Sequence, residues 1–464
     1  MSISRLRRTR TGGKSVNPLI TWYGDDFTGA AAVMEVLAFA GIETVLFSDL
    51  PDAEMLARFD GAGAIGVAST ARTEGPDWMD RELPQAFGFL KSLGAPLLHY
   101  KVCSTFDSSP QTGSIGRAAE IGLRVTGARA APVLTAAPQM RRYQAFGHLF
   151  AGTFDGVYRL DRHPVMARHP VTPMAEADLL RHLAVQTDLP SGLIDLEALW
   201  SDPQPRLTTL LESGAKILSI DSMEERSETA AGRLIWENQE DLSFVIGSQG
   251  VEFALVRHWQ EIGLIPRVAP PGSAGRVDQI AVVSGSVSPS TAQQIEWAVQ
   301  NGFTLIRLDA ARMIEAPEQT DALIDQAVAS ALSAVSDGQS PLVCSATGPE
   351  DPAVAQVRQA AAKTGTSMEV VNKTIGITLG KILDGILRGS NLTRAVISGG
   401  DTSGHGMRAL GLQAIKAIAP TIPGASLCIG YGGEHHDGLQ IALKGGQMGS
   451  MDFFGWIREG GGAR

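Results

Sequence analysis

Cysteine is scarce in this sequence. The 464 residues include three cysteines, Cys103, Cys344 and Cys428, which lie far apart and form no CxxC pair. An odd number of scattered cysteines excludes a disulfide framework and argues against a thiolate zinc site. Such cysteine usage is typical of proteins in a reducing compartment, so we expect this protein in the cytoplasm.

Long apolar runs and an export signal are also missing. Glu35 and Glu43 interrupt the most apolar part of the chain, so no run is long enough to span a bilayer. Residues 1–14 carry four arginines and a lysine, but no apolar segment follows them. We therefore expect residues 1–17 to form a disordered basic tail, and we expect no membrane partner.

The chain has no excess of positive charge. Its formal net charge is -10 and its isoelectric point is about 5.5. Binding to nucleic-acid phosphates requires a basic surface, so we exclude nucleic acid as a partner. We expect small-molecule ligands instead, and an anionic ligand would need a locally positive pocket.

Short apolar runs alternate with helical stretches along the chain, which predicts an α/β fold with mainly parallel sheets covered by helices. Strands are expected at residues 19–23, 44–47, 64–68 and 96–100, and again at residues 279–283, 303–308, 341–344 and 394–397. Helices are expected at residues 30–40, 290–301 and 320–335.

A cluster of prolines and glycines at residues 269–275 is the best candidate for a linker. A chain of 464 residues also exceeds what one hydrophobic core usually serves. We therefore predict two α/β domains, residues 18–268 and residues 276–464. Ligands of open α/β sheets bind at the carboxyl ends of the strands, so we expect a ligand cleft between the domains.

The loop at residues 24–30 contains two adjacent carboxylates, Asp25 and Asp26. One explanation is that Asp26 or Thr28 caps the helix that follows. Capping needs one such residue, however, and not a pair of aspartates. The pair therefore also indicates binding of substrate hydroxyls, and a carboxylate that removes a proton from an attacking alcohol.

Cationic side chains follow two other predicted strands. Arg72 and Lys101 lie in the loops after residues 64–68 and 96–100. A guanidinium or an ammonium group at these positions would hold a carboxylate, and the alternative is that either side chain is a surface cation. Residues 135–142 bring further polar groups to the same edge of the sheet.

The second half has glycine-rich and hydroxyl-rich loops after its strands, at residues 284–288, 398–404 and 444–449. Glycine lets the backbone approach an anion closely, and the N–H groups at the start of a helix bind phosphate. Asp401 would orient a magnesium ion or its waters. Three such loops together favour a nucleotide.

Several familiar site motifs are absent. The sequence has no GxxxxGK[ST] or GxSxG motif, and no strict GxGxxG follows a predicted strand, which argues against a P-loop, an α/β-hydrolase site and an ordinary dinucleotide site. Residues 434–437, Glu-His-His-Asp, are of metal-binding types, but adjacent histidines point in different directions and no second cluster has ligand spacing. We predict no metal site there, and the residues that would hold a metal stay unknown.

Residues 24–30 resemble the ADDLTGA segment of the four-carbon acid sugar kinase family. Residues 284–294, 398–404 and 444–449 resemble the nucleotide-binding motifs of that family in their order and rough spacing, and the similarity runs from about residue 19 to about residue 456. Cys103 stands where the family often has aspartate, and residues 444–447 read KGGQ in place of KSGN. These departures concern the substrate more than the fold.

The resemblance implies a sugar-acid-binding N-terminal domain, an ATP-binding C-terminal domain and Mg²⁺-dependent phosphorylation of a terminal hydroxyl of 3-oxo-tetronate, threonate or erythronate. It assigns nucleotide binding to Ser286, Gly399, Gly400, Asp401, Thr402 and Gly446. It assigns the substrate pocket to Asp25, Asp26, Arg72, Lys101, Ser104 and Arg141, and we predict that the two aspartates are catalytic.

Two alternatives remain at this point. One is a non-catalytic two-lobed protein that binds a sugar acid. The other is an NAD-dependent oxidoreductase of a hydroxy acid, against which the lack of a GxGxxG after a strand argues. The sequence leaves open the sugar acid and its stereoisomer, the hydroxyl that is phosphorylated, the general base, whether the chain forms a homodimer, and the role of residues 162–173.

Overall fold

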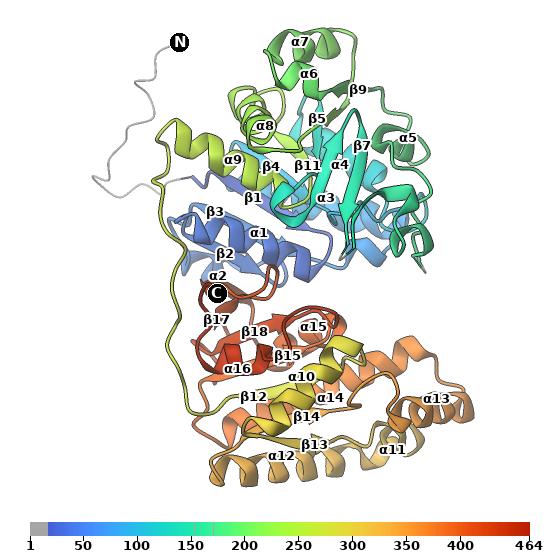
Figure 1. The fold of residues 1–464 in the computed structure, drawn as a ribbon, viewed down its shortest axis with the longest axis vertical. Helices are drawn as coiled ribbons and strands as arrows, with labels where there is room; N and C mark the ends of the chain where they lie inside the picture. The colour runs from blue at the N-terminus through green and yellow to red at the C-terminus, as the bar shows by residue number, and fades with distance from the viewer. Residues whose placement is uncertain (1–16, 154, 170) are drawn as a thin grey trace.

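A computed structural model describes residues 17–464, except residues 154 and 170. The tail expected at residues 1–17 therefore lies outside the described residues, apart from Asn17. The described residues form a mixed sheet of 15 strands with helices on both faces, and a small sheet of 3 strands (Figure 1). Among the helices that the structure describes, none is long and apolar enough to cross a membrane.

The large sheet begins with a four-strand unit in the N-terminal half. Its strand order is β2-β3-β1-β4, and all three pairings are parallel. The unit consists of β1 (Ile20–Gly24), α1 (Phe27–Phe39), β2 (Thr44–Phe47), α2 (Ala53–Ala57), β3 (Ala64–Ala68), α3 (Pro76–Ser92) and β4 (Leu97–Lys101). The connection after β1 runs to one side and the connection after β4 to the other, so a topological switch point lies between these two strands.

The C-terminal half repeats this arrangement. Its strand order is β13-β14-β12-β15. As in the N-terminal unit, the second strand along the chain comes first in the sheet, followed by the third, the first and the fourth. The unit consists of β12 (Ala281–Ser284), α10 (Pro289–Gln300), β13 (Phe303–Arg307), α11 (Ala310–Glu315), α12 (Thr320–Ser336), β14 (Ser340–Cys344), α13 (Pro352–Thr364), α14 (Met368–Arg388) and β15 (Arg394–Ser398). A second switch point therefore lies between β12 and β15.

The remaining elements extend each unit. In the N-terminal half they are α4 (Ile115–Thr126), β5 (Ala131–Leu134), the small sheet β6 (Arg142–Ala145), β7 (His148–Gly152) and β8 (Val157–Arg159), then α5 (Leu179–Ala184), β9 (Ser191–Ile194), α6 (Leu196–Leu199), α7 (Gln204–Glu212), β10 (Ile217–Ile220), α8 (Glu225–Glu237), β11 (Phe244–Gly247) and α9 (Gly250–Glu261). In the C-terminal half they are α15 (Gly400–Ala409), β16 (Ala414–Ala419), β17 (Leu427–Tyr431), β18 (Gln440–Lys444) and α16 (Phe453–Arg458). Residues 162–173, whose role the sequence left open, begin at the end of the 3-10 turn Leu160–Arg162 and include the 3-10 turn Met166–Arg168. The rings of His163 and His169 accept the N–H groups of Val165 and Thr172.

The predicted strands and helices are present, with ends that differ by a few residues. The largest difference is the first helix, which was expected at residues 30–40 and begins at Phe27. The reason is that Asp26 Oδ1 accepts the N–H of Gly29 at 2.9 Å and so caps the helix three residues earlier.

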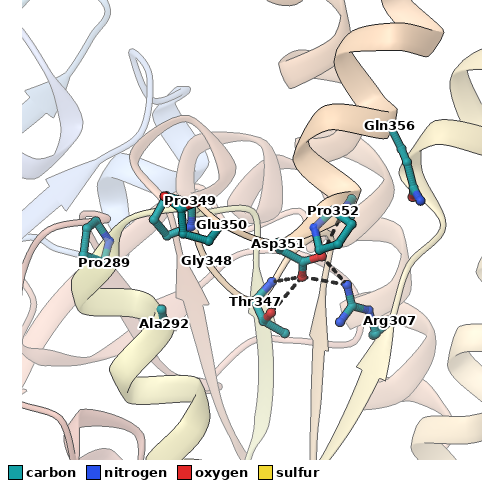
Figure 2. A pocket seen from close by; sticks show the side chains of 11 residues that line it. Pro289, Ala292, Arg307, Thr347, Gly348, Pro349, Glu350, Asp351, Pro352 and Gln356 are labelled. Carbon is teal, nitrogen blue, oxygen red and sulfur yellow. Dashed lines mark hydrogen bonds and ion pairs between the residues drawn. The ribbon is translucent and has the colours of Figure 1, made fainter.

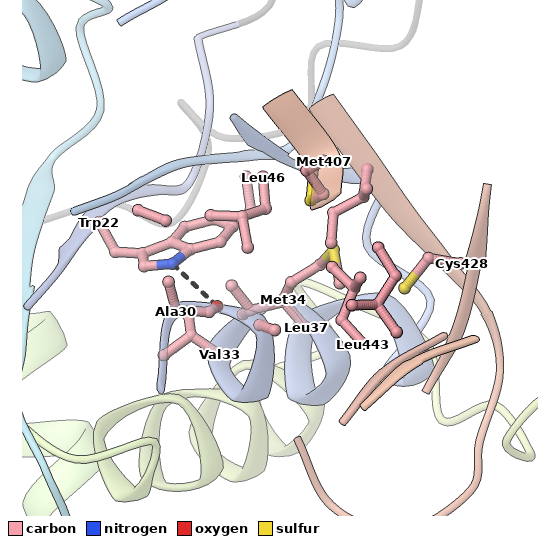
Figure 3. Packing of buried hydrophobic residues seen from close by; sticks show 14 of the residues in the cluster. Trp22, Ala30, Val33, Met34, Leu37, Leu46, Met407, Cys428 and Leu443 are labelled. Atoms are coloured by element: carbon pink, nitrogen blue, oxygen red, sulfur yellow. Dashed lines mark hydrogen bonds between the residues drawn. The ribbon is translucent and has the colours of Figure 1, made fainter. Parts of the chain in front are cut away.

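The two halves share one sheet, and one of the apolar clusters contains residues from both halves. Antiparallel strands β16 and β17 lie between the two units, and β16 pairs with β2 through Ala414 with Phe47 and Ile415 with Leu46. Figure 3 shows Met34 of α1 packed among Leu46, Met407 and Leu443, which come from both halves. Packing across the junction therefore holds the two lobes in register.

A buried carboxylate also joins the halves. Glu35, in the middle of α1, is 6% exposed and accepts the N–H groups of Gly424 at 2.7 Å and Ser426 at 2.9 Å, from the loop between β16 and β17. Burial raises the pKa of Glu35 to about 7, although these two N–H groups oppose the shift.

The raised pKa predicts a pH-dependent stability. Because the folded protein holds a proton on Glu35 more tightly than the unfolded chain does, the contribution of Glu35 is most favourable below its unfolded pKa and is lost as the pH rises through about 7. We expect the free energy of unfolding of wild type, relative to that of Glu35→Gln, to fall by about 2 to 3 kcal/mol between pH 5 and pH 8. Urea titrations at several pH values measure this difference. Glu43→Gln, at an exposed glutamate that pairs with Lys416, is the control and should show no such trend.

Candidate functional site

The loops that follow β1, β3 and β4 begin side by side. Gly24, the last residue of β1, is paired with Ala68 of β3 and with Lys101 of β4, which are also the last residues of their strands. The first switch point therefore gathers the polar loops that follow these strands, as the sequence predicted.

Arg72 joins the two aspartates of the first loop. Its Nη2 donates to Asp25 Oδ1 at 2.7 Å and to Asp26 Oδ1 at 2.7 Å, and its Nε donates to Asp25 Oδ2 at 3.2 Å. Both oxygens of Asp25 are thus occupied, and its side chain is 4% exposed. Burial raises the pKa of Asp25, whereas Arg72 opposes the shift.

Asp26 differs from Asp25 in two respects. Its side chain is 29% exposed, and its Oδ2 accepts a hydrogen bond from no residue that the structure describes. The Oδ1 atom caps α1, so the capping and the functional explanations of this residue are compatible. Asp26 is therefore the aspartate with an oxygen available for a substrate hydroxyl.

The ends of β1, β3 and β4 and the loops that follow them form the first half-site. Lys101 and Ser104 also belong to it. Lys101 is buried, donates to the carbonyl of Val102 at 2.6 Å, and has its Nζ only 2.8 Å from where a Cβ on Gly29 would lie. Ser104 is partly exposed and has no hydrogen bond from its hydroxyl to a described residue. Burial raises the pKa of the Cys103 thiol, which keeps it neutral, so this substitution removes a negative charge from the pocket relative to the aspartate common in the family.

Arg141 and its neighbour Arg142 have different surroundings. Arg141 adopts a left-handed backbone conformation with φ 57°, and its guanidinium donates to the carbonyls of Thr153 and Gly156. Arg142 has a buried Nε without a partner among the described residues, and its Nη1 donates only to main-chain carbonyls.

Arg142 also belongs electrostatically to the pocket. Burial lowers its pKa, and Cys103 and Asp107 oppose the shift, which places the guanidinium near the loop that follows β4. An arginine stays protonated at such a position. Sequence reasoning chose Arg141 and did not single out Arg142, because two adjacent arginines look alike without the backbone turn between them.

The second half-site has the same construction as the first. Ser284 of β12 is paired with Ser398 of β15, and Ser398 is paired with Lys444 of β18. These are the last residues of their strands, so the three glycine loops leave the sheet side by side at the second switch point.

The predicted nucleotide residues in these loops are close together. A Cβ on Gly446 would lie 2.6 Å from Ser286 Oγ, and a Cβ on Gly399 would lie 2.9 Å from Thr402 Oγ1. Gly400 and Asp401 open α15, and Ser288 caps α10 by accepting the N–H of Thr291 at 3.1 Å. Two helix N-termini and a glycine turn thus converge, which is an arrangement that binds phosphate.

A buried lysine lies beneath the Gly446 turn. Lys444 Nζ donates to the carbonyls of Gly445 at 2.9 Å and Gly446 at 3.4 Å, and to Thr291 Oγ1 at 3.3 Å. Burial lowers the pKa of Lys444 to about 8, so the group carries a charge at neutral pH. It holds these carbonyls on the inner side of the turn and adds positive potential to a phosphate site.

The two half-sites meet at one residue. Thr28, from the aspartate loop, and Met448, from the last glycine loop, both approach Gly424, where a Cβ would lie 3.4 Å from Thr28 Cγ2 and 3.5 Å from Met448 Cε. Helices α1 and α15, which begin at the two half-sites, are also in contact. A ligand at one half-site would therefore lie beside a ligand at the other.

The Glu-His-His-Asp segment makes ion pairs with other elements. His436 Nε2 lies 2.6 Å from Asp384 Oδ1, and Asp437 forms a two-bond pair with Arg58. Among the described residues, no group of three metal-binding side chains could hold a metal ion. The hydroxyls of Ser286 and Thr402 fit Mg²⁺ bound mainly by the phosphates of a nucleotide, a mode that needs few protein ligands.

Two family models match the chain. Residues 20–255 match a sugar-binding N-terminal domain, and residues 281–454 match a nucleotide-binding C-terminal domain. The two models together cover both four-strand units and every loop described above.

Curated relatives match nearly the whole chain. A 3-oxo-isoapionate kinase of Paraburkholderia graminis is 45% identical over 445 residues, which is 95% of this chain and 94% of that protein. A 3-oxo-tetronate kinase of Burkholderia multivorans is 32% identical over 94% of this chain and 96% of that protein.

Solved structures share the fold. A Salmonella typhimurium LT2 protein, described as a tRNA synthase, superimposes with a TM-score of 0.76 at 24% identity, over 95% of this chain and 98% of that one. A Haemophilus influenzae protein superimposes with a TM-score of 0.71 at 22% identity, over 94% of this chain and 99% of that one. At such identities the likeness shows the fold alone.

Proposed function

This chain belongs to the four-carbon acid sugar kinase family and is an ATP-dependent sugar-acid kinase, and from that premise we propose that it phosphorylates a 3-oxo sugar acid at the junction of the two half-sites. The observation that carries this proposal is the approach of Thr28 and Met448 to Gly424, because it brings the aspartate loop beside the glycine loops. Among the family substrates, 3-oxo-isoapionate ranks first and 3-oxo-tetronate second, by the identities of the relatives that use them. The cytoplasm, where ATP is available, is the compartment that we assign.

Charge pairing indicates which cation holds the acid. Arg72 is shared by Asp25 and Asp26, and Lys101 lies beside the same carboxylates. These four charges cancel, so they leave no net attraction for an anion. Arg142 has no carboxylate partner within ion-pair distance among the described residues, and an arginine fork suits a carboxylate. We therefore assign the carboxylate of the substrate to Arg142.

Catalysis then needs alignment and a proton acceptor. Asp26 Oδ2 would accept the hydrogen bond of the terminal hydroxyl of the acid. It would take the hydroxyl proton as the hydroxyl oxygen attacks the γ-phosphorus and the bond from that phosphorus to ADP breaks, so that ADP leaves. The N–H groups at the starts of α10 and α15, with the Gly446 turn, would hold the phosphates of ATP. Mg²⁺ would enter with ATP and neutralise charge on its phosphates, and Asp401, in the loop that opens α15, is the residue that we assign to orient the ion or its waters.

A substrate panel tests the function. ADP release, coupled to NADH oxidation, is measured with 3-oxo-isoapionate, 3-oxo-tetronate, threonate and erythronate. We expect turnover with at least one 3-oxo acid and a phosphorylated acid in an amount equal to the ADP formed. ADP without a phosphorylated acid, or no ADP with any of the four acids, would contradict the proposal.

Paired arginine variants test the carboxylate site. We expect Arg142→Gln to raise KM for the acid by about 10- to 100-fold, the effect of losing a charge-assisted pair, and to leave KM for ATP unchanged. Arg141→Gln should change KM for the acid by less than 3-fold, because its guanidinium contacts a loop of the small sheet. The reverse pattern would assign the carboxylate to Arg141, which the sequence analysis placed in the substrate pocket.

A further inference from the structure

The loop between β16 and β17, residues 420–426, is a part of the main chain that both half-sites touch. Its residue Gly424 has φ 83°, a conformation that favours glycine. Thr28 of the aspartate loop and Met448 of the last glycine loop both lie against Gly424. A shift of residues 420–426 would therefore change how these two loops lie relative to each other.

Glu35 of α1 holds residues 420–426 through both oxygens of its carboxylate. Its Oε2 accepts the N–H of Gly424 at 2.7 Å, and its Oε1 accepts the N–H of Ser426 at 2.9 Å. Hydrogen bonds to an ionised group are roughly twice as strong as bonds between neutral groups. Two such bonds, from residues that lie two positions apart, fix the loop at two points.

The stability of the fold alone does not explain a carboxylate at this position. Glu35 is the single charged residue of α1, and its side chain is buried. Among the described residues it has no cation as a partner. An apolar side chain would avoid the cost of burying a carboxylate without a cation. The choice of glutamate therefore points to a role in the site.

Helix α1 links Glu35 to the proposed base. The helix begins after Asp26, which caps it, and Thr28 and Glu35 lie seven residues apart within it. Seven residues make about two turns of an α-helix, so both side chains lie on one face of α1. Both contact the same loop. The bonds of Glu35 therefore fix residues 420–426 relative to Asp26.

Other loops of each lobe are held by residues of their own lobe. In the first half-site, Arg72 joins the two aspartates. In the C-terminal half, Asp351 accepts hydrogen bonds from Arg307 and Thr347 and fixes the loop after β14 (Figure 2). These contacts do not involve Glu35, so its loss should spare the binding of each ligand alone.

We propose that Glu35 is a positioning residue: by holding Gly424 between Thr28 and Met448, its carboxylate sets the gap across which the phosphoryl group passes from ATP to the acid. The proposal rests on the proposed function. It assigns Glu35 a role in the transfer step and none in the binding of either ligand alone.

An amide in place of the carboxylate tests the proposal. The oxygen of glutamine accepts one N–H of the loop, whereas its NH₂ group is a donor and cannot accept the other. At pH 8, above the pKa of about 7, we expect Glu35→Gln to lower kcat by about 10- to 100-fold, because transfer is sensitive to a misplacement of about 1 Å. The Kd of ADP alone and the Kd of the acid alone should stay within about 2-fold of wild type.

Glu43→Gln is the matched control. Glu43 pairs with Lys416 and so also joins the two halves, but it makes no hydrogen bond to a described residue of the loop. Its kcat should match that of wild type. The kinetics use 3-oxo-isoapionate, or 3-oxo-tetronate if the first acid is inactive, and isothermal titration measures each Kd. Gly424→Ala is a second variant, which keeps Glu35 and strains the loop, and it should give the same selective loss of kcat.

The outcomes separate this proposal from the function itself. A Glu35→Gln enzyme with the kcat of wild type would overturn the proposal, and so would weaker binding of either ligand in step with the loss of kcat. If a melting curve shows that Glu35→Gln does not fold, Gly424→Ala decides by the same two criteria. If wild type phosphorylates neither acid, the proposed function fails, whatever the variants do.

Discussion

An Asp26→Asn enzyme is expected to lose about 10²- to 10⁴-fold in kcat, with KM for ATP unchanged. The reason is that the amide cannot take the proton of the attacking hydroxyl, although it can still accept a hydrogen bond. Asparagine caps helices as well as aspartate does, so α1 and the fold should be retained. Steady-state kinetics with saturating ATP, together with a melting curve of the variant, measure both parts of this expectation.

The chain offers a matched control for this change. Asp52 caps α2 by accepting the N–H of Met55 at 2.8 Å, as Asp26 caps α1. Asp52→Asn should therefore leave kcat unchanged. An Asp26→Asn enzyme with full kcat would remove this residue from the role of base.

A Gly399→Ala enzyme is expected to lose about 100-fold or more in kcat/KM for ATP. Gly399 has φ 127°, a conformation that residues with side chains rarely adopt, and an added Cβ would lie 2.9 Å from Thr402 Oγ1. The turn must shift, and the N–H groups that it aims at phosphate shift with it. Losing one such preorganised donor typically costs 10²- to 10³-fold.

Gly404, in helix α15 that Gly399 caps, serves as the control. A Cβ on Gly404 would have no atom within 4 Å, and alanine favours helix, so Gly404→Ala should retain activity. KM for the acid should change little in either variant, because the acid lies on the other lobe. Equal losses in the two variants would show that the effect is not specific to the turn at Gly399.

Short apolar runs were sufficient to predict the strands of both units. Residues 44–47 and 64–68 form strands with the predicted ends, and polar loops follow each of the predicted strands at one edge. The rule that ligands bind at the carboxyl ends of parallel strands pointed to the loop of Asp25 in one lobe and to the glycine loops in the other. The structure brings the loops of each lobe side by side, and their roles in binding stay predictions.

Features that depend on long-range contacts could not be read from the sequence. The pairing of β16 with β2 joins residues more than 360 positions apart, and a carboxylate in the middle of a helix, such as Glu35, gives no sign of its partners at Gly424 and Ser426. The choice between Arg141 and Arg142 depends on a left-handed residue, which sequence patterns do not predict for arginine.

Hydrogen–deuterium exchange with one ligand at a time tests most directly that the acid and the nucleotide occupy opposite lobes. We predict that the sugar acid alone protects the backbone of residues 24–30 and 101–107, and that ADP alone protects residues 284–291, 398–404 and 444–449. Protection of the same lobe by both ligands, or protection of neither set of loops, would contradict the account.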